Sequence, residues 1–230
     1  EDLWLELALA RQVIRAAVRK ARPEWPENAP GPRPELLPWF SSNLGVMAEY
    51  EADYERSRAL HEEGLALRIE AGDKAAIAIS QMNIGNVLLL LGRPDEARAR
   101  QEESLRLRRE TGDPWSIALG EHNLAILLRS EGDYDTARGL FAGALETFAD
   151  KGDKWALAFI LEDVAVLAVL IDEPAVALRL GGAGAAVREE TGSPRGEADQ
   201  AELDSQLAPA REALGDRADA LWEAGRLGGL

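Results

Sequence analysis

Two histidines, His61 and His122, are the side chains best suited to act as a catalytic base or a metal ligand in this chain of 230 residues. The helical patterns place them on different helices, and Glu62 and Glu63 beside His61 point in different directions on a helix. The sequence has no cysteine, which excludes disulfides, thiolate catalysis and metal centres held by cysteine. We therefore expect no catalytic residues, no metal and no cofactor.

A glycine-rich stretch, Gly181-Gly182-Ala183-Gly184, is similar to the loops with which many proteins hold phosphate groups. It lacks the lysine and the serine or threonine of that motif, and it follows no predicted strand. We expect these glycines to allow two helices to approach closely instead.

The charge of the chain limits its partners. Acidic residues outnumber basic residues by 41 to 26, which gives a formal net charge of −15. A field of that sign repels nucleic acid, and no apolar run approaches the length of about 20 residues that spans a bilayer. We expect a cytoplasmic protein with no nucleic-acid ligand and no membrane span.

A repeat of 40 residues organises the elements that carry these groups. The pair Gly-Asp recurs at residues 72–73, 112–113 and 152–153, with Gly192-Ser193 as a weaker copy. Phasing on this pair gives the units 35–74, 75–114, 115–154 and 155–194. Two further columns of residues recur at the same spacing. The first is Asn43, Asn83, Asn123 and Asp163, and each of these is followed by an aliphatic and then a small residue. The second is Ser57, Ala97, Ala137 and Ala177.

Each unit is predicted to form two helices joined by a tight turn. In the second unit the apolar residues keep a helical period up to Leu91, and the period resumes at Ala97 after Gly92-Arg93-Pro94. Pro94 and Pro174 suit the first turn of a helix, where no N–H group is needed. The glycine of each Gly-Asp pair suits the left-handed position after a helix, and the aspartate can cap the next helix. The sequence therefore predicts an all-α solenoid of antiparallel helix hairpins.

This pattern resembles the tetratricopeptide repeat family, in its long variety of 40 rather than 34 residues. The matching columns are the Asn-aliphatic-small motif, the alanines Ala97, Ala137 and Ala177, and the Gly-Asp joint. The resemblance implies a right-handed superhelix that acts as a non-catalytic scaffold or sensor and binds proteins or peptides.

The resemblance also implies that the asparagine column faces a concave groove lined by the first helices of the repeats. The side-chain amides could clamp the backbone of a bound peptide there, because each amide offers a donor and an acceptor. Aromatic and apolar neighbours would supply pockets. The predicted partner-binding residues are Asn43, Asn83, Asn86, Asn123, Trp39, Tyr50, Ile79, Met82, Leu119, His122 and Phe159. The alternative is that each asparagine bridges adjacent repeats or caps a neighbouring carbonyl.

Some tetratricopeptide domains bind a C-terminal carboxylate with lysines and an arginine beside the asparagines. The corresponding positions of this sequence hold Trp39, Ile79 and Leu119, and Arg129 is the basic residue that we place near the groove. We therefore expect a protein or peptide partner with an apolar or amphipathic binding segment rather than an acidic one.

The flanks of the repeats carry further helical patterns. Residues 198–214 and 217–226 are predicted to form a pair of capping helices, and residues 3–22 an amphipathic helix followed by a proline-rich connector up to residue 34. The predicted domains are therefore 1–34, the four repeats over 35–194, and the capping helices over 195–230.

Three short segments near the C-terminus resemble the ends of the repeat arrays in large bacterial signal-transduction ATPases and transcriptional regulators. They are Ala185–Gly192, Ala210–Gly215 and Trp222–Arg226. This resemblance implies an alternative function, in which the chain is the regulatory arm of a larger signalling protein and acts through intramolecular contacts. The sequence begins without methionine, and we expect it to be a segment of something longer. Assembly of copies into a homo-oligomer, through the N-terminal helix or the Gly-rich fourth unit, stays open.

Overall fold

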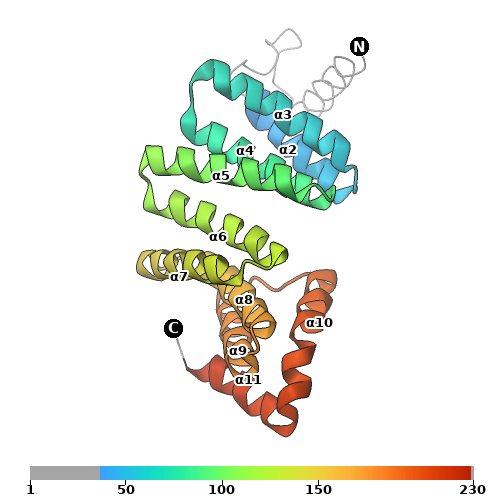
Figure 1. The fold of residues 1–230 in the computed structure, drawn as a ribbon, viewed down its shortest axis with the longest axis vertical. Helices are drawn as coiled ribbons and strands as arrows, with labels where there is room; N and C mark the ends of the chain where they lie inside the picture. The colour runs from blue at the N-terminus through green and yellow to red at the C-terminus, as the bar shows by residue number, and fades with distance from the viewer. Residues whose placement is uncertain (1–36, 229–230) are drawn as a thin grey trace, which may run out of the picture. The chain divides into compact units, whose positions relative to one another are not determined.

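The computed structural model describes residues 37–228, with side chains from Ser41 onward. The predicted N-terminal helix over 3–22 and the proline-rich connector lie outside the described residues. All regular structure in the described part is helical, and it forms the all-α helical solenoid that the sequence predicts (Figure 1).

The helices follow one another in pairs joined by short turns. The pairs are α2 (Leu37–Tyr50) with α3 (Tyr54–Ala71), α4 (Lys74–Leu90) with α5 (Pro94–Thr111), α6 (Pro114–Glu131) with α7 (Tyr134–Lys151), α8 (Lys154–Leu170) with α9 (Pro174–Thr191), and α10 (Glu197–Leu214) with α11 (Ala218–Leu227). The second helices of the first four pairs begin at intervals of 40 residues. Helices α2 and α3 belong to one compact unit, and α4 to α11 belong to another.

The Gly-Asp joints set where helices end and begin. Gly112 and Gly152 have φ angles of 78° and 66°, the left-handed conformation that costs glycine nothing. The carboxylates of Asp113 and Asp153 then accept hydrogen bonds from backbone N–H groups in the first turn of the next helix, at 2.8 and 3.0 Å. The predicted roles of this joint are confirmed at both positions.

Small residues allow the two helices of a pair to pack closely. A Cβ atom added to Gly85 of α4 would lie 2.9 Å from Nε2 of Gln101 on α5, and one added to Gly45 of α2 would lie 2.6 Å from Nε2 of His61 on α3. Ala97 on α5 is fully buried. The predicted packing role of the small columns is confirmed in both units.

The last two helices pack on the fourth repeat. A Cβ atom added to Gly182 of α9 would lie 2.1 Å from the carbonyl oxygen of Trp222 on α11, and one added to Gly225 of α11 would lie 2.0 Å from the carbonyl oxygen of Arg179. The two backbones are therefore in direct contact, which confirms that the glycine-rich stretch is a close helix contact. Helix α10 adds Leu203, Leu207 and Leu214 to the core formed with α8 and α9.

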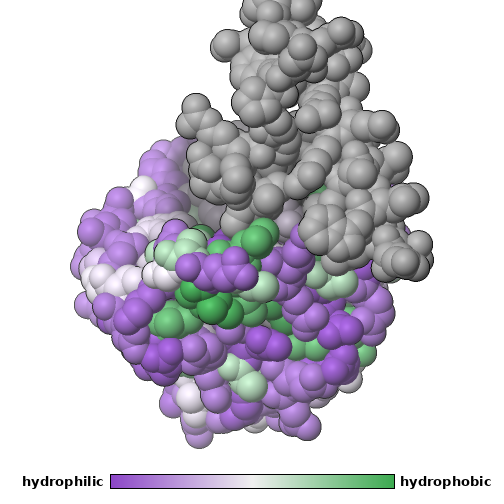
Figure 2. Space-filling model, turned by 90° about the horizontal axis from the view of Figure 1, so that it is seen from above, coloured by the Kyte–Doolittle hydropathy of each residue, from purple (hydrophilic) through white to green (hydrophobic). Residues whose placement is uncertain are grey.

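One face of the described residues is mainly polar. Hydrophilic residues cover most of the face shown in Figure 2, and hydrophobic residues gather in a limited patch on it. Within residues 37–228, no helix has both the length and the apolar character needed to cross a bilayer.

Candidate functional site

Three of the predicted partner-binding residues lie on α2, in the first unit. Asn43 is exposed, and Tyr50 keeps 89% of its surface accessible. Trp39 lies in the first turn of the helix, and its side chain is outside the described part of the chain.

Helix α4 carries four more of these residues. Ile79 is 43% exposed, and Asn83, one turn further along, is half-buried. The side-chain amide of Asn83 makes no hydrogen bond to any other residue in the described part of the chain. The amide of Asn86 is used internally, because its Oδ1 accepts a hydrogen bond of 2.7 Å from Nε2 of Gln101. Helix α4 thus offers an apolar side chain and an unused amide on one face.

Met82 connects α4 to the following repeat. Its Sδ accepts hydrogen bonds from Nδ2 of Asn123 at 3.2 Å and from Nη2 of Arg108 at 3.4 Å. The amide of Asn123 also donates to the carbonyl of Leu119, one turn earlier on α6, at 2.8 Å. Asn123 therefore bridges repeats and caps a carbonyl, the alternative arrangement considered for this column. Its role in partner binding stays a prediction.

Asp163 connects α8 to α6. Its Oδ2 lies 2.8 Å from Nε2 of His122, and its Oδ1 lies 3.0 Å from Nη1 of Arg129. Burial alone would raise the pKa of Asp163, but the hydrogen bond from His122 and the charge of Arg129 outweigh it and hold the pKa below its ordinary value. Arg129, which the sequence places near the groove, is therefore engaged by this carboxylate.

Glu162, the neighbour of Asp163, is 3% exposed and holds two arginines. Nε and Nη2 of Arg188 donate to its two carboxylate oxygens at 2.6 and 2.8 Å, and Arg195 donates to one of the same oxygens. Paired, fork-like contacts of this kind are the strong form of the arginine–carboxylate interaction. This triad ties α8 to α9 and to the connection that leads into α10.

Phe159, the last of the predicted groove residues, lies one turn before Glu162 on α8. The guanidinium of Arg188 lies 4.3 Å from the centre of its ring, and the ring of Trp155 lies 4.5 Å away. Trp155 is 56% exposed. Trp155 is not among the residues predicted from the sequence, although an aromatic residue one turn from a predicted groove residue was a usable signal.

The buried arginines were also missed. Arg68, Arg108 and Arg188 occupy equivalent positions of their repeats and are all buried, while Phe148 fills the same position in the third repeat. Arg108 donates to the carbonyl and to the hydroxyl of Ser116 on α6, at 3.1 and 2.7 Å. Burial lowers the pKa of Arg68 and of Arg108. The 40-residue spacing of these arginines was the signal that could have found them.

The histidine and carboxylates brought together by α6 and α8 serve to join helices. Arg188 and Arg195 form ion pairs with Glu162. His122 and Arg129 lie within hydrogen-bond distance of the carboxylate of Asp163. Across residues 37–228, no cluster of three or more histidine, cysteine or acidic side chains has the geometry to hold a metal ion. The side chains around Glu162 and Asp163 therefore join helices within the fourth repeat and between the third and fourth repeats.

Comparison with family models decides what kind of repeat this is. Residues 37–110 and residues 122–154 match models of the tetratricopeptide repeat. These segments are similar in sequence to tetratricopeptide repeats. Repeats of this family typically form non-catalytic scaffolds that bind other proteins. No curated protein matches the sequence.

Solved structures share the fold. The crystal structure of BtubC (BKLC) from P. vanneervenii is 21% identical and covers 98% of this chain and 90% of its own, with a TM-score of 0.68. The nearly identical TPR-like repeats of a kinesin light chain candidate from Podosopora anserina are 19% identical and cover 84% of this chain and 95% of their own, with a TM-score of 0.62. At these identities the likeness shows the fold alone.

Proposed function

We propose that this chain binds an apolar or amphipathic segment of a protein partner along the first helices of its repeats. The observation that carries the proposal is the pair Ile79 and Asn83 on α4. An exposed apolar side chain lies one turn from an amide that makes no hydrogen bond within residues 37–228, on the same helix face. The side chain can anchor the partner, and the amide can donate to and accept from its backbone.

Neighbouring first helices support the same choice of partner. Leu119 on α6 and Phe159 on α8 occupy the position of Ile79 in their repeats, and both are half-buried. Trp155 on α8 adds an exposed aromatic side chain, a type that often dominates the energy of protein interfaces. Because Arg129 is engaged by Asp163 and the chain is acidic overall, a polyanionic partner is disfavoured.

The test is a selection of random displayed peptides against the whole chain, followed by measurement of the affinity of the selected peptides. We expect apolar or amphipathic sequences to be selected. Ile79→Glu should weaken their binding about tenfold or more, because it places a charge in the apolar contact. Ile69→Glu on α3 is the matched control, since Ile69 is 57% exposed and lies on a second helix. Equal affinity for both variants would refute the proposed surface.

The alternative function, a regulatory arm, rests on the resemblance of the segments 185–192, 210–215 and 222–226 to arrays in bacterial signalling ATPases. The spacing of the helix starts by 40 residues agrees with the long variety of repeat proposed for such arrays. The test is the gene sequence around this segment. A phosphate-binding NTPase domain in the same chain supports this function, and its absence removes it.

A further inference from the structure

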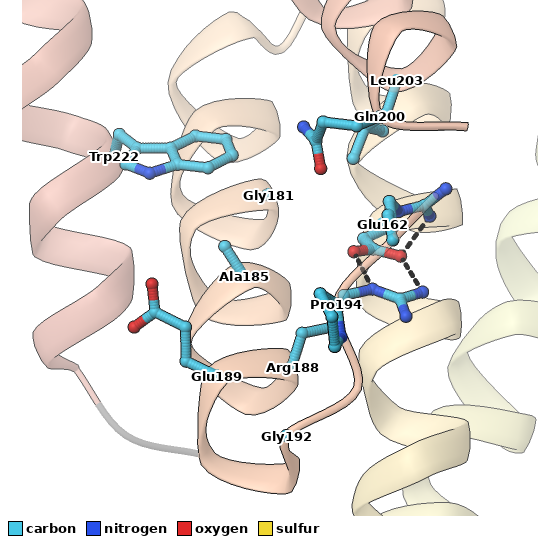
Figure 3. A pocket seen from close by; sticks show the side chains of 11 residues that line it. Glu162, Gly181, Ala185, Arg188, Glu189, Gly192, Pro194, Gln200, Leu203 and Trp222 are labelled. Carbon is cyan, nitrogen blue, oxygen red and sulfur yellow. Dashed lines mark hydrogen bonds and ion pairs between the residues drawn. The ribbon is translucent and has the colours of Figure 1, made fainter. Parts of the chain in front are cut away.

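A pocket lies beside the Glu162 triad, at the C-terminal end of the second unit. Its volume is about 280 Å³, and helices α8, α9, α10 and α11 all contribute to its lining. Figure 3 shows Trp222 of α11 on one side and Leu203 and Gln200 of α10 on the other, with Gly181 and Ala185 of α9 between them. None of these residues belongs to the proposed partner surface, so the pocket is a separate feature.

The apolar part of the pocket is held in place by packing. The edge of the Trp222 ring lies against Gly181, where an added Cβ atom would be 2.7 Å from Cζ3 of the ring. The guanidinium carbon of Arg211 lies 4.8 Å from the centre of the same ring. Ala185, one turn from Gly181, is small enough to leave space open. A rigid aromatic wall beside small residues suits a flat apolar group, because little freedom is lost when that group binds.

The polar end of the pocket carries an excess of positive charge. Arg188 and Arg195 share the single carboxylate of Glu162, which leaves one positive charge uncompensated in this triad. Nε of Arg195 is buried and has no hydrogen-bond partner in the described part of the chain. A buried donor without a partner costs free energy that a ligand with an acceptor would recover.

The other acidic residues near the triad, Asp163 and Asp199, attract Arg195 through their charge but make no hydrogen bond or ion pair with it in the described part of the chain. Asp163 is held by His122 and Arg129, and Glu189 on the rim forms a paired contact with Arg226 at 2.7 and 3.0 Å. Asp199 in the first turn of α10 is exposed to solvent, where its field is screened.

We propose that this pocket binds a compact organic carboxylate whose apolar body is about the size of one aromatic ring. The carboxylate pairs with the guanidinium of Arg195, and the ring packs against Trp222 and Ala185. The volume lies just below the range of about 300–1,000 Å³ that is usual for drug-sized ligands, which limits the occupant to a small acid. A free aromatic acid and the C-terminal residue of a peptide both carry this chemistry.

The test is calorimetric titration of the whole chain with phenylacetate, with neutral phenylacetamide, and with N-acetyl-glycyl-phenylalanine. We expect phenylacetate to bind with millimolar or better affinity and phenylacetamide to bind about tenfold more weakly, since a charged acceptor gains more from a guanidinium than a neutral one. Tighter binding of the dipeptide than of phenylacetate identifies a peptide end as the source, and the reverse order identifies a free acid. Failure of both acids to bind, or equal binding of the acid and the amide, overturns the proposal.

Two variants place the binding in the pocket. Arg195→Gln removes the unpartnered donor and its charge, while Ala185→Leu keeps every charge and fills the space. Each should weaken phenylacetate binding about tenfold or more, and Arg217→Gln, an exposed arginine outside the pocket, should leave it unchanged. Far-UV circular dichroism of each variant reports whether it is folded. Unchanged affinity in folded Ala185→Leu shows that the acid binds elsewhere and overturns the proposal.

Discussion

At the scale of single residues, the glycines of α9 and α11 decide how closely these two helices pack. Gly182→Ala places a methyl group 2.1 Å from a backbone carbonyl oxygen of α11, which no side-chain rotation can relieve. We predict a loss of about 1–3 kcal/mol in the free energy of unfolding, the usual cost of an overpacked contact. Urea denaturation of both proteins measures it.

Gly139→Ala is the control for that substitution. Gly139 is an exposed glycine within α7, and a Cβ atom added there meets nothing within 4 Å. It should raise stability by about 0.5–1 kcal/mol, because alanine loses less backbone freedom than glycine in a helix. Equal changes in the free energy of unfolding for the two variants would contradict the close backbone contact between α9 and α11.

The carboxylate of Glu162 is buried and pairs with two arginines. Glu162→Gln removes the shared partner of Arg188 and Arg195 while it nearly preserves the shape of the side chain. Because a buried charge is left without its partner, we predict a loss of about 3–5 kcal/mol in the free energy of unfolding. Chemical denaturation at neutral pH provides the measurement.

The matched control for Glu162 is Glu190→Gln on the same hairpin. Glu190 pairs with Lys154, and both side chains are more than half exposed. Exposed pairs contribute little to stability, so this variant should unfold at nearly the denaturant concentration of the unmodified chain. A loss at Glu162 no larger than at Glu190 would contradict the buried triad.

At the scale of the elements, Asp163 links α8 to α6 and should make stability depend on pH. Its pKa is lowered in the folded chain, so its ionised form stabilises the fold above the ordinary aspartate pKa of about 4. That contribution is lost as the pH falls through the lower, folded-state pKa. The groups that face it are the imidazole of His122 and the guanidinium of Arg129 on α6, and Arg195 before α10.

Asp163→Asn isolates this effect. The difference in the free energy of unfolding between the unmodified chain and the variant should be largest near neutral pH and should shrink below about pH 4. Urea denaturation at a series of pH values gives the difference directly. A difference that stays constant down to low pH would show that the carboxylate charge of Asp163 contributes nothing.

The helices were predictable from the sequence, and the connections between them were not. The period of the apolar residues, the left-handed glycine at Gly112 and the capping carboxylate of Asp113 are all local, so they mark helix ends without knowledge of the fold. The pairing of Asp163 with His122 depends on which faces of α6 and α8 meet. No spacing within one repeat reveals that.

The candidate site was predictable only in part for the same reason. The repeat columns led to Ile79 and Asn83, which the structure shows with exposed or half-buried side chains. The same columns led to Asn123, whose amide is occupied by Leu119 and Met82. A column identifies equivalent backbone positions, but the neighbours of each side chain decide whether its polar groups are free.

At the scale of the whole molecule, the first helices of the repeats carry both internal joints, such as Asp163 with His122, and exposed apolar side chains. The second helix α5 carries the buried Arg108, which ties its repeat to α6 of the next repeat. The first helices carry side chains such as Ile79 and Trp155 that stay exposed. These exposed side chains are the ones that we propose for partner binding.

The measurement that tests this account most directly compares Asn83→Ala with Asn123→Ala, for both stability and affinity toward a selected apolar peptide. Because the Asn83 amide makes no hydrogen bond to the residues that the structure describes, its loss should leave stability unchanged and weaken binding about tenfold. Because the Asn123 amide holds Leu119 and Met82, its loss should lower the free energy of unfolding by about 1 kcal/mol. Unchanged peptide affinity in a fully folded Asn83→Ala chain would contradict the proposed binding surface.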